Sequence, residues 1–159
     1  MSGSCLVCAE HAAIARGDAA ASELVAWRGS RWTLRHHPHP SPLAGWMLLD
    51  LNRHAQGPAD LAGDEAHEFG AVMGAAMRAV RTATGVPRVY SVMFGETAAH
   101  LHAHLIPRDP SCEATKAWAV ADWYREVARN PELATSRDSI VEMTRAIARA
   151  GAHELNLFA

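Results

Sequence analysis

HLHAHLIPR, residues 100–108, places three histidines in alternation with apolar residues. Successive side chains of a β-strand point to opposite faces, so an extended 100–106 segment would array His100, His102 and His104 on one face. A surface strand can carry histidines without further meaning. Three aligned imidazoles nevertheless favour a metal site or histidine chemistry, because imidazole both binds metals and titrates near neutral pH. This stretch alone leaves those two uses open.

The composition is that of a folded globular protein. The chain has 159 residues, of which 49% are hydrophobic and 20% charged, with a formal net charge of −2. Without a basic excess, no nucleic-acid polymer is expected as a partner. No run is long enough for a membrane helix, and the N-terminus resembles no signal peptide. Three cysteines, two of them in Cys5-x-x-Cys8, make no disulfide framework and indicate a reducing cytoplasm, with a metal or redox use for the pair.

Apolar periodicity predicts five strands and one long helix in the first two thirds of the chain. The strands are expected at residues 24–27, 31–34, 45–51, 86–94 and 100–106. Residues 9–21 are alanine-rich and suit a short helix. Residues 64–84 carry apolar side chains at helical spacing, with acidic residues in the first turn and Gly85 as a stop. The methionines in this helix are most simply core residues.

The last third of the chain reads as helical. Helices are expected at 113–129 and 138–150, and we treat 111–159 as an extension of a domain formed by residues 1–110. The first of these helices would use four apolar contacts, Trp118, Val120, Trp123 and Val127. His11, His67 and His153 have no motif partner and are expected on the surface.

Four motifs together resemble the histidine triad superfamily, in its zinc-bearing branch. They are the HLHAHLIPR stretch, the Gly95–Ala99 segment that leads into it, the strand from Gly45 to His54, and Cys5-x-x-Cys8. The likeness covers roughly residues 5–108. It implies an α+β fold, namely a five-stranded antiparallel sheet with a long helix between strands three and four. Members usually dimerise through this helix and the strand after it, so a homodimer is expected.

The resemblance also implies roles for the residues around the triad. His102 matches a nucleophile that attacks an α-phosphorus and forms a nucleotidyl-imidazole intermediate, with a backbone carbonyl holding its other ring nitrogen. His104 and Thr97 match contacts to the phosphate and the leaving group, and Gly95 and Glu96 belong to the same phosphate-binding loop. The implied activity is that of a nucleotide hydrolase or nucleotidyl transferase, acting on a dinucleoside polyphosphate or a nucleoside phosphoramidate.

Cys5, Cys8, His54 and His100 match the zinc ligands of that branch. A Cys2His2 set is a closed tetrahedral site, which favours a structural ion. Other readings stay open. Cys5 and Cys8 could be a redox pair, His54 a plain strand-end residue, Thr97 a turn residue and His102 a third metal ligand. A protein whose three triad histidines all bind ions is a further alternative, and would hold more than one metal per chain.

Three departures from the pattern bear on function. Trp46 stands where many members have histidine, and Glu96 replaces the usual glutamine. No acidic residue that could hold ribose hydroxyls is recognisable at the end of the second strand, where the chain reads His36-His37-Pro38-His39-Pro40. These departures keep a second hypothesis open, in which the chain is a nucleotide-binding or scaffold module with little activity.

Overall fold

A five-stranded antiparallel sheet, ordered β1-β2-β3-β5-β4, forms the centre of the molecule. The computed structural model describes residues 5–159. The strands are β1 (Val25–Arg28), β2 (Trp32–His36), β3 (Met47–Leu51), β4 (Arg88–Val92) and β5 (His102–Arg108). The predicted α+β architecture is confirmed, including the long helix between the third and fourth strands.

In the described part of the chain, five α-helices accompany the sheet: α1 (Leu6–Ala15), α2 (Ala19–Ser22), α3 (Asp64–Thr84), α4 (Ala117–Arg129) and α5 (Arg137–Leu155). Helix α3 has the predicted bounds and ends at Gly85, whose φ of +72° suits the left-handed cap that glycine adopts most easily. The helix expected at 9–21 starts earlier, at Leu6, and is divided by a turn at Gly17 (φ +78°). Short 3-10 turns lie at Pro58–Asp60, Glu113–Thr115, Pro131–Leu133 and Asn156–Phe158.

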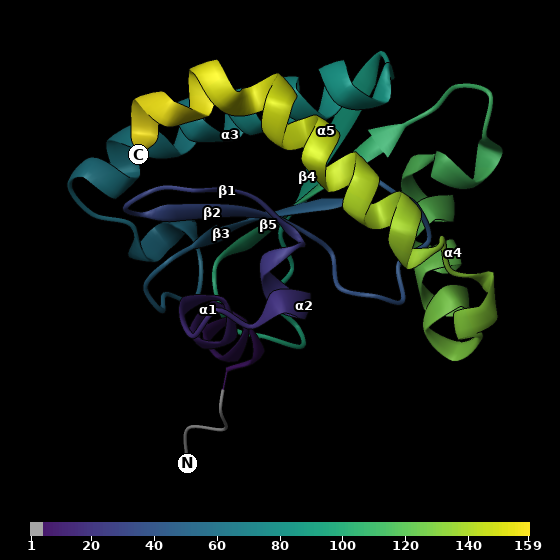
Figure 1. The fold of residues 1–159 in the computed structure, drawn as a ribbon, viewed down its shortest axis with the longest axis horizontal. Coiled ribbons are helices and arrows are strands. Elements are labelled where there is room, and N and C mark those ends of the chain that lie inside the picture. Colours follow the sequence, from purple (N-terminus) through teal and green to yellow (C-terminus); the bar gives the residue numbers. More distant parts are fainter. Residues whose placement is uncertain (1–4) are drawn as a thin grey trace.

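The two faces of the sheet differ in chemistry. One face joins the main hydrophobic core through alternating residues such as Leu34, Leu49 and Leu105, which pack with the buried stripe of α3. On the other face the register places Asp50 opposite His102 and Leu48 opposite His104. Helices α3 and α5 cover the first face, and α1 and α2 lie beyond the second (Figure 1). The polar groups of the site therefore belong to the face that α3 and α5 leave free.

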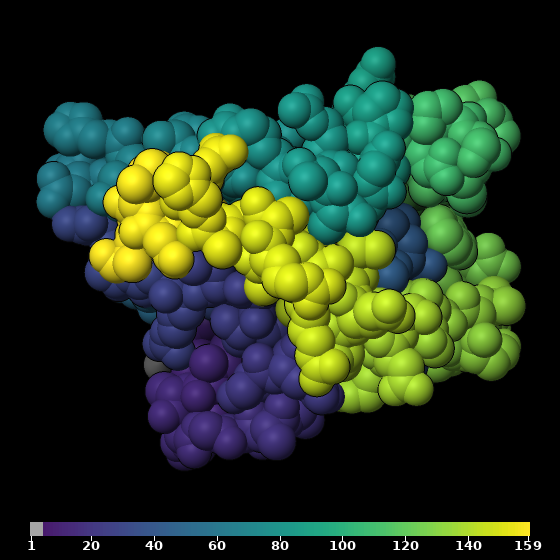
Figure 2. Space-filling view, turned by 45° about the horizontal axis from the view of Figure 1, so that its top comes forward, coloured from purple at the N-terminus to yellow at the C-terminus, as the bar shows by residue number. Residues whose placement is uncertain are grey.

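The C-terminal helices complete the core. Helix α5 crosses the molecule beside α3 and packs on α3, β1 and β2 (Figure 2). Its Ile147 and Leu155 are fully buried in the main core. Gly151 permits this close approach, because a Cβ there would lie 2.9 Å from that of Ala79.

Helix α4 joins a second, smaller core with Trp46 and Ile106. The expectation for its apolar contacts is confirmed for Val120 and Val127, which are buried. It is wrong for Trp118, whose side chain is 81% exposed. Among residues 5–159, no helix has the length and apolar character needed to cross a lipid bilayer.

Candidate active site and metal centre

The three triad histidines do not share one strand face. Strand β5 begins only at His102, so His102 and His104 alternate with buried Ala103 and Leu105 as expected. His100 lies before the strand and is fully buried, and its ring turns toward the cysteines instead. The prediction of a single imidazole row over 100–106 is therefore wrong for its first member. The three rings serve two separate clusters.

His102 is held by one strong hydrogen bond. Its Nδ1 lies 2.6 Å from the carbonyl oxygen of His100, and a carbonyl can only accept, so Nδ1 carries the proton. In this tautomer Nε2 presents a lone pair, and no protein partner for it is found within residues 5–159. Its ring centroid lies 5.1 Å from that of His104. The family resemblance implies a backbone carbonyl near the first triad histidine in this role, and the His100 carbonyl lies there.

His104 is held by a side chain rather than by the backbone. The indole Nε1–H of Trp46 donates to Nδ1 of His104 at 3.0 Å. Burial is the main cause that lowers the pKa of His104 to about 4, and the neighbouring His102 and Arg35 act in the same direction. Around neutral pH the His104 ring is therefore uncharged.

The second cluster brings together Cys5, Cys8, His54 and His100. Their candidate ligand atoms all lie within 4.8 Å of one another. Cys5 is the residue before α1, Cys8 is in its first turn, His54 follows β3, and His100 precedes β5. All four residues expected to bind a metal thus converge from separate parts of the chain. Both thiols are free, with no disulfide between them.

The spacing within this cluster fits a tetrahedral cation. The Sγ–Nδ1 distances are 3.5 Å from Cys5 to His100, from Cys8 to His54 and from Cys8 to His100. Zinc bonds of about 2.3 Å to sulfur and 2.0–2.1 Å to nitrogen, at tetrahedral angles, would separate S and N by about 3.6 Å. His100 Nε2–H donates to the Leu51 carbonyl at 2.7 Å, which leaves Nδ1 as a lone pair facing the thiols. Such an outer hydrogen bond is what orients metal-binding histidines.

The thiols themselves also favour a cation. Burial and the neighbouring Cys5 thiol raise the pKa of Cys8. Two adjacent thiolates would be costly without a compensating positive charge, whereas a soft divalent ion stabilises the deprotonated form. The residues present therefore fit zinc.

A buried charge network lies beside His102. Asp50 has no exposed surface, and its Oδ2 accepts hydrogen bonds from Arg35 Nε at 2.6 Å and from His11 Nε2 at 3.1 Å. Burial alone would raise the pKa of Asp50, but the charge of Arg35 and the hydrogen bonds from His11 and Arg35 outweigh it and lower that pKa. The expectation that His11 is a surface residue is wrong, because its ring is 7% exposed and bonded to this carboxylate.

Removing the Asp50 charge should destabilise the protein strongly. In Asp50→Asn, the guanidinium of Arg35 would stay buried without its ion partner, which commonly costs about 3–5 kcal/mol. Denaturant unfolding at pH 7 measures the loss. Asp64→Asn is the matched control, because Asp64 pairs with Arg31 at the exposed surface, where such pairs contribute about 1 kcal/mol or less.

The stability difference between the native protein and Asp50→Asn should depend on pH in a defined direction. Because the folded-state pKa of Asp50 is lowered, its contribution is present above the unfolded pKa of about 3.9. The contribution is lost as the pH falls through the folded pKa. The stability gap between the native protein and Asp50→Asn should therefore narrow in strong acid, and a gap that widens there would contradict this assignment.

The loop before the triad stands apart from both clusters. Gly95 has a φ of +71°, a left-handed conformation that favours glycine. Glu96 and Thr97 are exposed. Within the described chain neither side chain makes a hydrogen bond to His102 or His104. Their assignment to phosphate binding stays a prediction.

Sequence reasoning missed the groups that surround the two catalytic candidates. Asp50 could have been found from the sequence, since it is the one charged residue in the apolar stretch 46–51, and a charge in a buried strand needs a partner. His11 could also have been found, because it lies three residues after Cys8 and shares its helix face. No feature of the sequence points to Tyr124. Its contact with Trp46, at a centroid distance of 5.4 Å, depends on how α4 packs.

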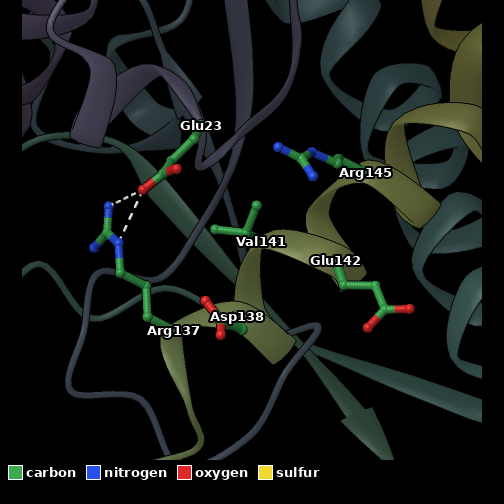
Figure 3. A pocket seen from close by; sticks show the side chains of 6 residues that line it. All are labelled: Glu23, Arg137, Asp138, Val141, Glu142 and Arg145. Atoms are coloured by element: carbon green, nitrogen blue, oxygen red, sulfur yellow. Dashed lines mark hydrogen bonds and ion pairs between the residues drawn. The ribbon is translucent and has the colours of Figure 1, made fainter.

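A separate surface depression of about 330 Å³ lies where α5 begins (Figure 3). Its lining residues are Glu23, Arg137, Asp138, Val141, Glu142 and Arg145. Arg137 Nε donates to Glu23 Oε1 at 2.9 Å across it, so opposite charges here already pair with each other. None of these residues belongs to the histidine clusters, and the depression plays no part in the site.

Comparison with solved structures identifies the architecture. A histidine triad nucleotide-binding protein from Sulfolobus tokodaii, described as hypothetical, aligns with a TM-score of 0.67 at 14% identity, over 92% of this chain and 93% of its own. A zinc-bound histidine triad family protein from Mycobacterium smegmatis aligns with a TM-score of 0.66 at 18% identity, over 94% of both chains. A HIT family hydrolase from Clostridium thermocellum aligns with a TM-score of 0.52 at 18% identity, over 70% of this chain and 96% of its own.

No protein-family model and no curated protein matches the sequence. The first two structural alignments span more of the chain than residues 1–110 could supply, so the likeness extends into 111–159. The sheet order, the position of α3 and these alignments agree with what the motif resemblance implied. The chain therefore has the histidine triad fold, with a four-residue thiol and imidazole cluster compatible with zinc.

Proposed function

We propose that this protein is a nucleotide hydrolase or nucleotidyl transferase that acts at an α-phosphate through a covalent intermediate on His102. The observation that carries the proposal is the arrangement of His102. Its Nδ1–H is fixed on the His100 carbonyl, and its Nε2 is left as a lone pair beside the neutral His104. The hydrolase and nucleotide-binding names of proteins with this fold are consistent with it.

The chemistry follows from the ring orientation. Nε2 of His102 would attack the α-phosphorus, and the positive charge that develops on the ring is stabilised through the short Nδ1–H bond to the carbonyl. His104 would donate a hydrogen bond to a phosphoryl oxygen, where negative charge gathers in the transition state. We assign Gly95, Glu96 and Thr97 to the loop that contacts the phosphates. Water or another acceptor would then release the nucleotide.

Cys5, Cys8, His54 and His100 would bind the zinc ion, and the ion would have a structural role. All four positions of a tetrahedral ion are occupied by protein atoms, so none is left for substrate. The ion would tie α1 to the start of β5. Because the thiols must stay reduced for this, we also propose a cytoplasmic location.

A panel of nucleotide conjugates tests the proposed function. Dinucleoside polyphosphates, nucleoside phosphoramidates and nucleotidyl sugars would be incubated with zinc-loaded protein, and nucleotide release followed by chromatography. Turnover of at least one conjugate is expected. If nucleotides bind but none of the conjugates is turned over, the chain is better described as a nucleotide-binding or scaffold module.

We further propose a homodimer formed through α3 and β4. Strand β4 lies at an edge of the sheet, with Arg88 and Ser91 exposed, and is followed by the exposed apolar side chains of Met93 and Phe94. Light scattering at micromolar concentration should give twice the mass of one chain. A single-chain mass at that concentration would contradict the proposal.

A further inference from the structure

Trp46 determines which nitrogen of His104 carries the proton. Indole Nε1–H can only donate a hydrogen bond, so Nδ1 of His104, 3.0 Å away, must present its lone pair. The single proton of the neutral ring then lies on Nε2. No protein partner is found for this Nε2–H within residues 5–159, so it is available to a ligand. His104 thus offers one donor and has no second ring proton to give.

Trp46 is held firmly in this position. Its side chain is 4% exposed, and its carbonyl accepts from the backbone N–H of His37 at 2.8 Å. The preceding residue, Gly45, has a φ of +92° and donates its N–H to Nε2 of His36 at 2.9 Å. Tyr124 from α4 packs against the rings of both Trp46 and His37. These hydrogen bonds fix the backbone at Trp46, and the indole cannot turn away without losing its ring contacts with Tyr124 and His37.

The groups that face His104 do not supply a proton either. His37 lies 5.9 Å away between ring centroids, and burial lowers its pKa to about 3. His102 already uses its Nδ1–H on the His100 carbonyl. Asp50 pairs with Arg35, and this contact helps to lower the pKa of the carboxyl, so Asp50 has no proton to give. Protonating His104 itself would set its Nδ1–H against the indole N–H and leave the buried Trp46 donor unpaired, which is unfavourable.

We propose that Trp46 is a specificity-determining residue that restricts this site to phosphoanhydrides, whose leaving group departs as a phosphate anion without accepting a proton. This inference rests on the proposed function and narrows its substrate class. Trp46 acts through His104 and is a positioning residue. Because Tyr124 of α4 packs against Trp46, the segment 111–159 helps to position this residue.

The anhydride reaction balances without a general acid. The Nε2 lone pair of His102 forms the bond to the α-phosphorus, and the P–O bond to the leaving phosphate breaks. The electron pair of that bond stays on the leaving oxygen, which departs as an anion. In the second step water attacks the phosphorus, the P–N pair returns to Nε2, and the proton of water passes to solvent. His104 keeps its Nε2–H throughout and only donates a hydrogen bond.

Cleavage of a phosphoramidate needs a proton donor for the leaving nitrogen, which this arrangement of His104 does not supply. Its nitrogen must gain a proton before the P–N bond breaks, because an amide anion is a very poor leaving group. If His104 gave up its Nε2–H, it would become an imidazolate, since Nδ1 has no proton. General acid catalysis typically contributes about 10²–10⁴-fold, so its absence should lower phosphoramidate turnover by at least about a hundredfold.

The first part of the test observes the tautomer directly. Ring ¹⁵N NMR of the zinc-loaded protein should show His104 with a protonated Nε2 and an unprotonated Nδ1 from pH 5 to 8. In Trp46→Phe, which keeps an aromatic ring but removes the donor, His104 should become protonated at higher pH than in the native protein. Trp123→Phe is the matched control. It loses an indole from the same apolar cluster, but Trp123 makes no hydrogen bond to His104.

The second part compares kcat/KM for diadenosine tetraphosphate and for an N-alkyl adenosine phosphoramidate. The native protein and Trp123→Phe should favour the anhydride by about a hundredfold or more. Trp46→Phe should narrow that ratio at least about tenfold, because His104 can then bind a second proton and donate it.

Each outcome of the two measurements has one meaning. A native ratio near one, or a ratio that Trp46→Phe leaves unchanged, overturns the specificity inference while the proposed function stands. A His104 ring in the native protein that titrates near pH 6.5 overturns it as well. If the NMR result is as expected but neither these two compounds nor any conjugate of the panel is turned over, the proposed function fails, and the substrate assignment falls with it.

Discussion

Replacing His102 with alanine should lower kcat by about three orders of magnitude or more on any conjugate that the native protein turns over. A nucleophile has no substitute within such a site, because the covalent step itself is lost. The fold and zinc content should remain, since His102 is only partly buried and its ring bonds to one carbonyl. Steady-state rates, circular dichroism and elemental analysis check the three parts of this expectation.

Trapping the intermediate makes the test sharper. Rapid acid-free quenching with an α-labelled nucleotide should leave label on the native chain, and the label should be released by acid, as a phosphoramidate bond is. His104→Ala should still form the adduct, more slowly, because it removes a hydrogen bond and leaves the nucleophile in place. If His102→Ala keeps most of the activity, or if label never appears on the chain during the first turnover, the mechanism is wrong.

Loss of the bound metal should lower the free energy of unfolding strongly. Protein purified without added metal should contain about one zinc per chain. Cys8→Ser should lose it and become less stable by about 3 kcal/mol or more, because structural zinc contributes directly to the free energy of folding. Thermal unfolding and elemental analysis measure both effects. Cys112→Ser is the matched control, since Cys112 lies outside the cluster.

A chelator should act in the same direction as Cys8→Ser. Stability should fall more than the activity of the molecules that remain folded, because no coordination position faces the substrate. Less than about one tenth of an equivalent of zinc in the native protein would contradict the assignment, as would full retention of zinc in Cys8→Ser. More than one metal per chain would instead favour the reading in which all three triad histidines bind ions.

Elements whose sequence signals lie within their own residues could be predicted from the sequence. Helix α3 carries its own apolar stripe, acidic first turn and glycine stop, so its bounds could be predicted from the sequence. The four members of the metal cluster could be predicted only through the resemblance, because Cys5 and His100 are far apart in sequence. Their convergence depends on α1 docking beside the end of β3.

The remaining site depends on side chains that meet across elements. No spacing rule connects Trp46 with His104 or Asp50 with His11, since each pair joins different strands, loops or helices. His100 shows the limit of the alternation rule. The rule holds only inside a strand, and β5 begins two residues later. An alternating pattern thus indicates which residues share a face, but not where the strand starts.

The span of the thiol and imidazole cluster bears on how a newly made chain acquires its structure. The cysteines leave the ribosome first, whereas His100 is separated from Cys5 by 95 positions. Closing so long a loop is entropically unfavourable until intervening contacts have shortened it, so the sheet must pair before the ion can join both ends. The segment that carries Cys5 and Cys8 is therefore among the last to take its place, although it is synthesised before the strands. Metal capture then reports that the centre of the domain is already assembled.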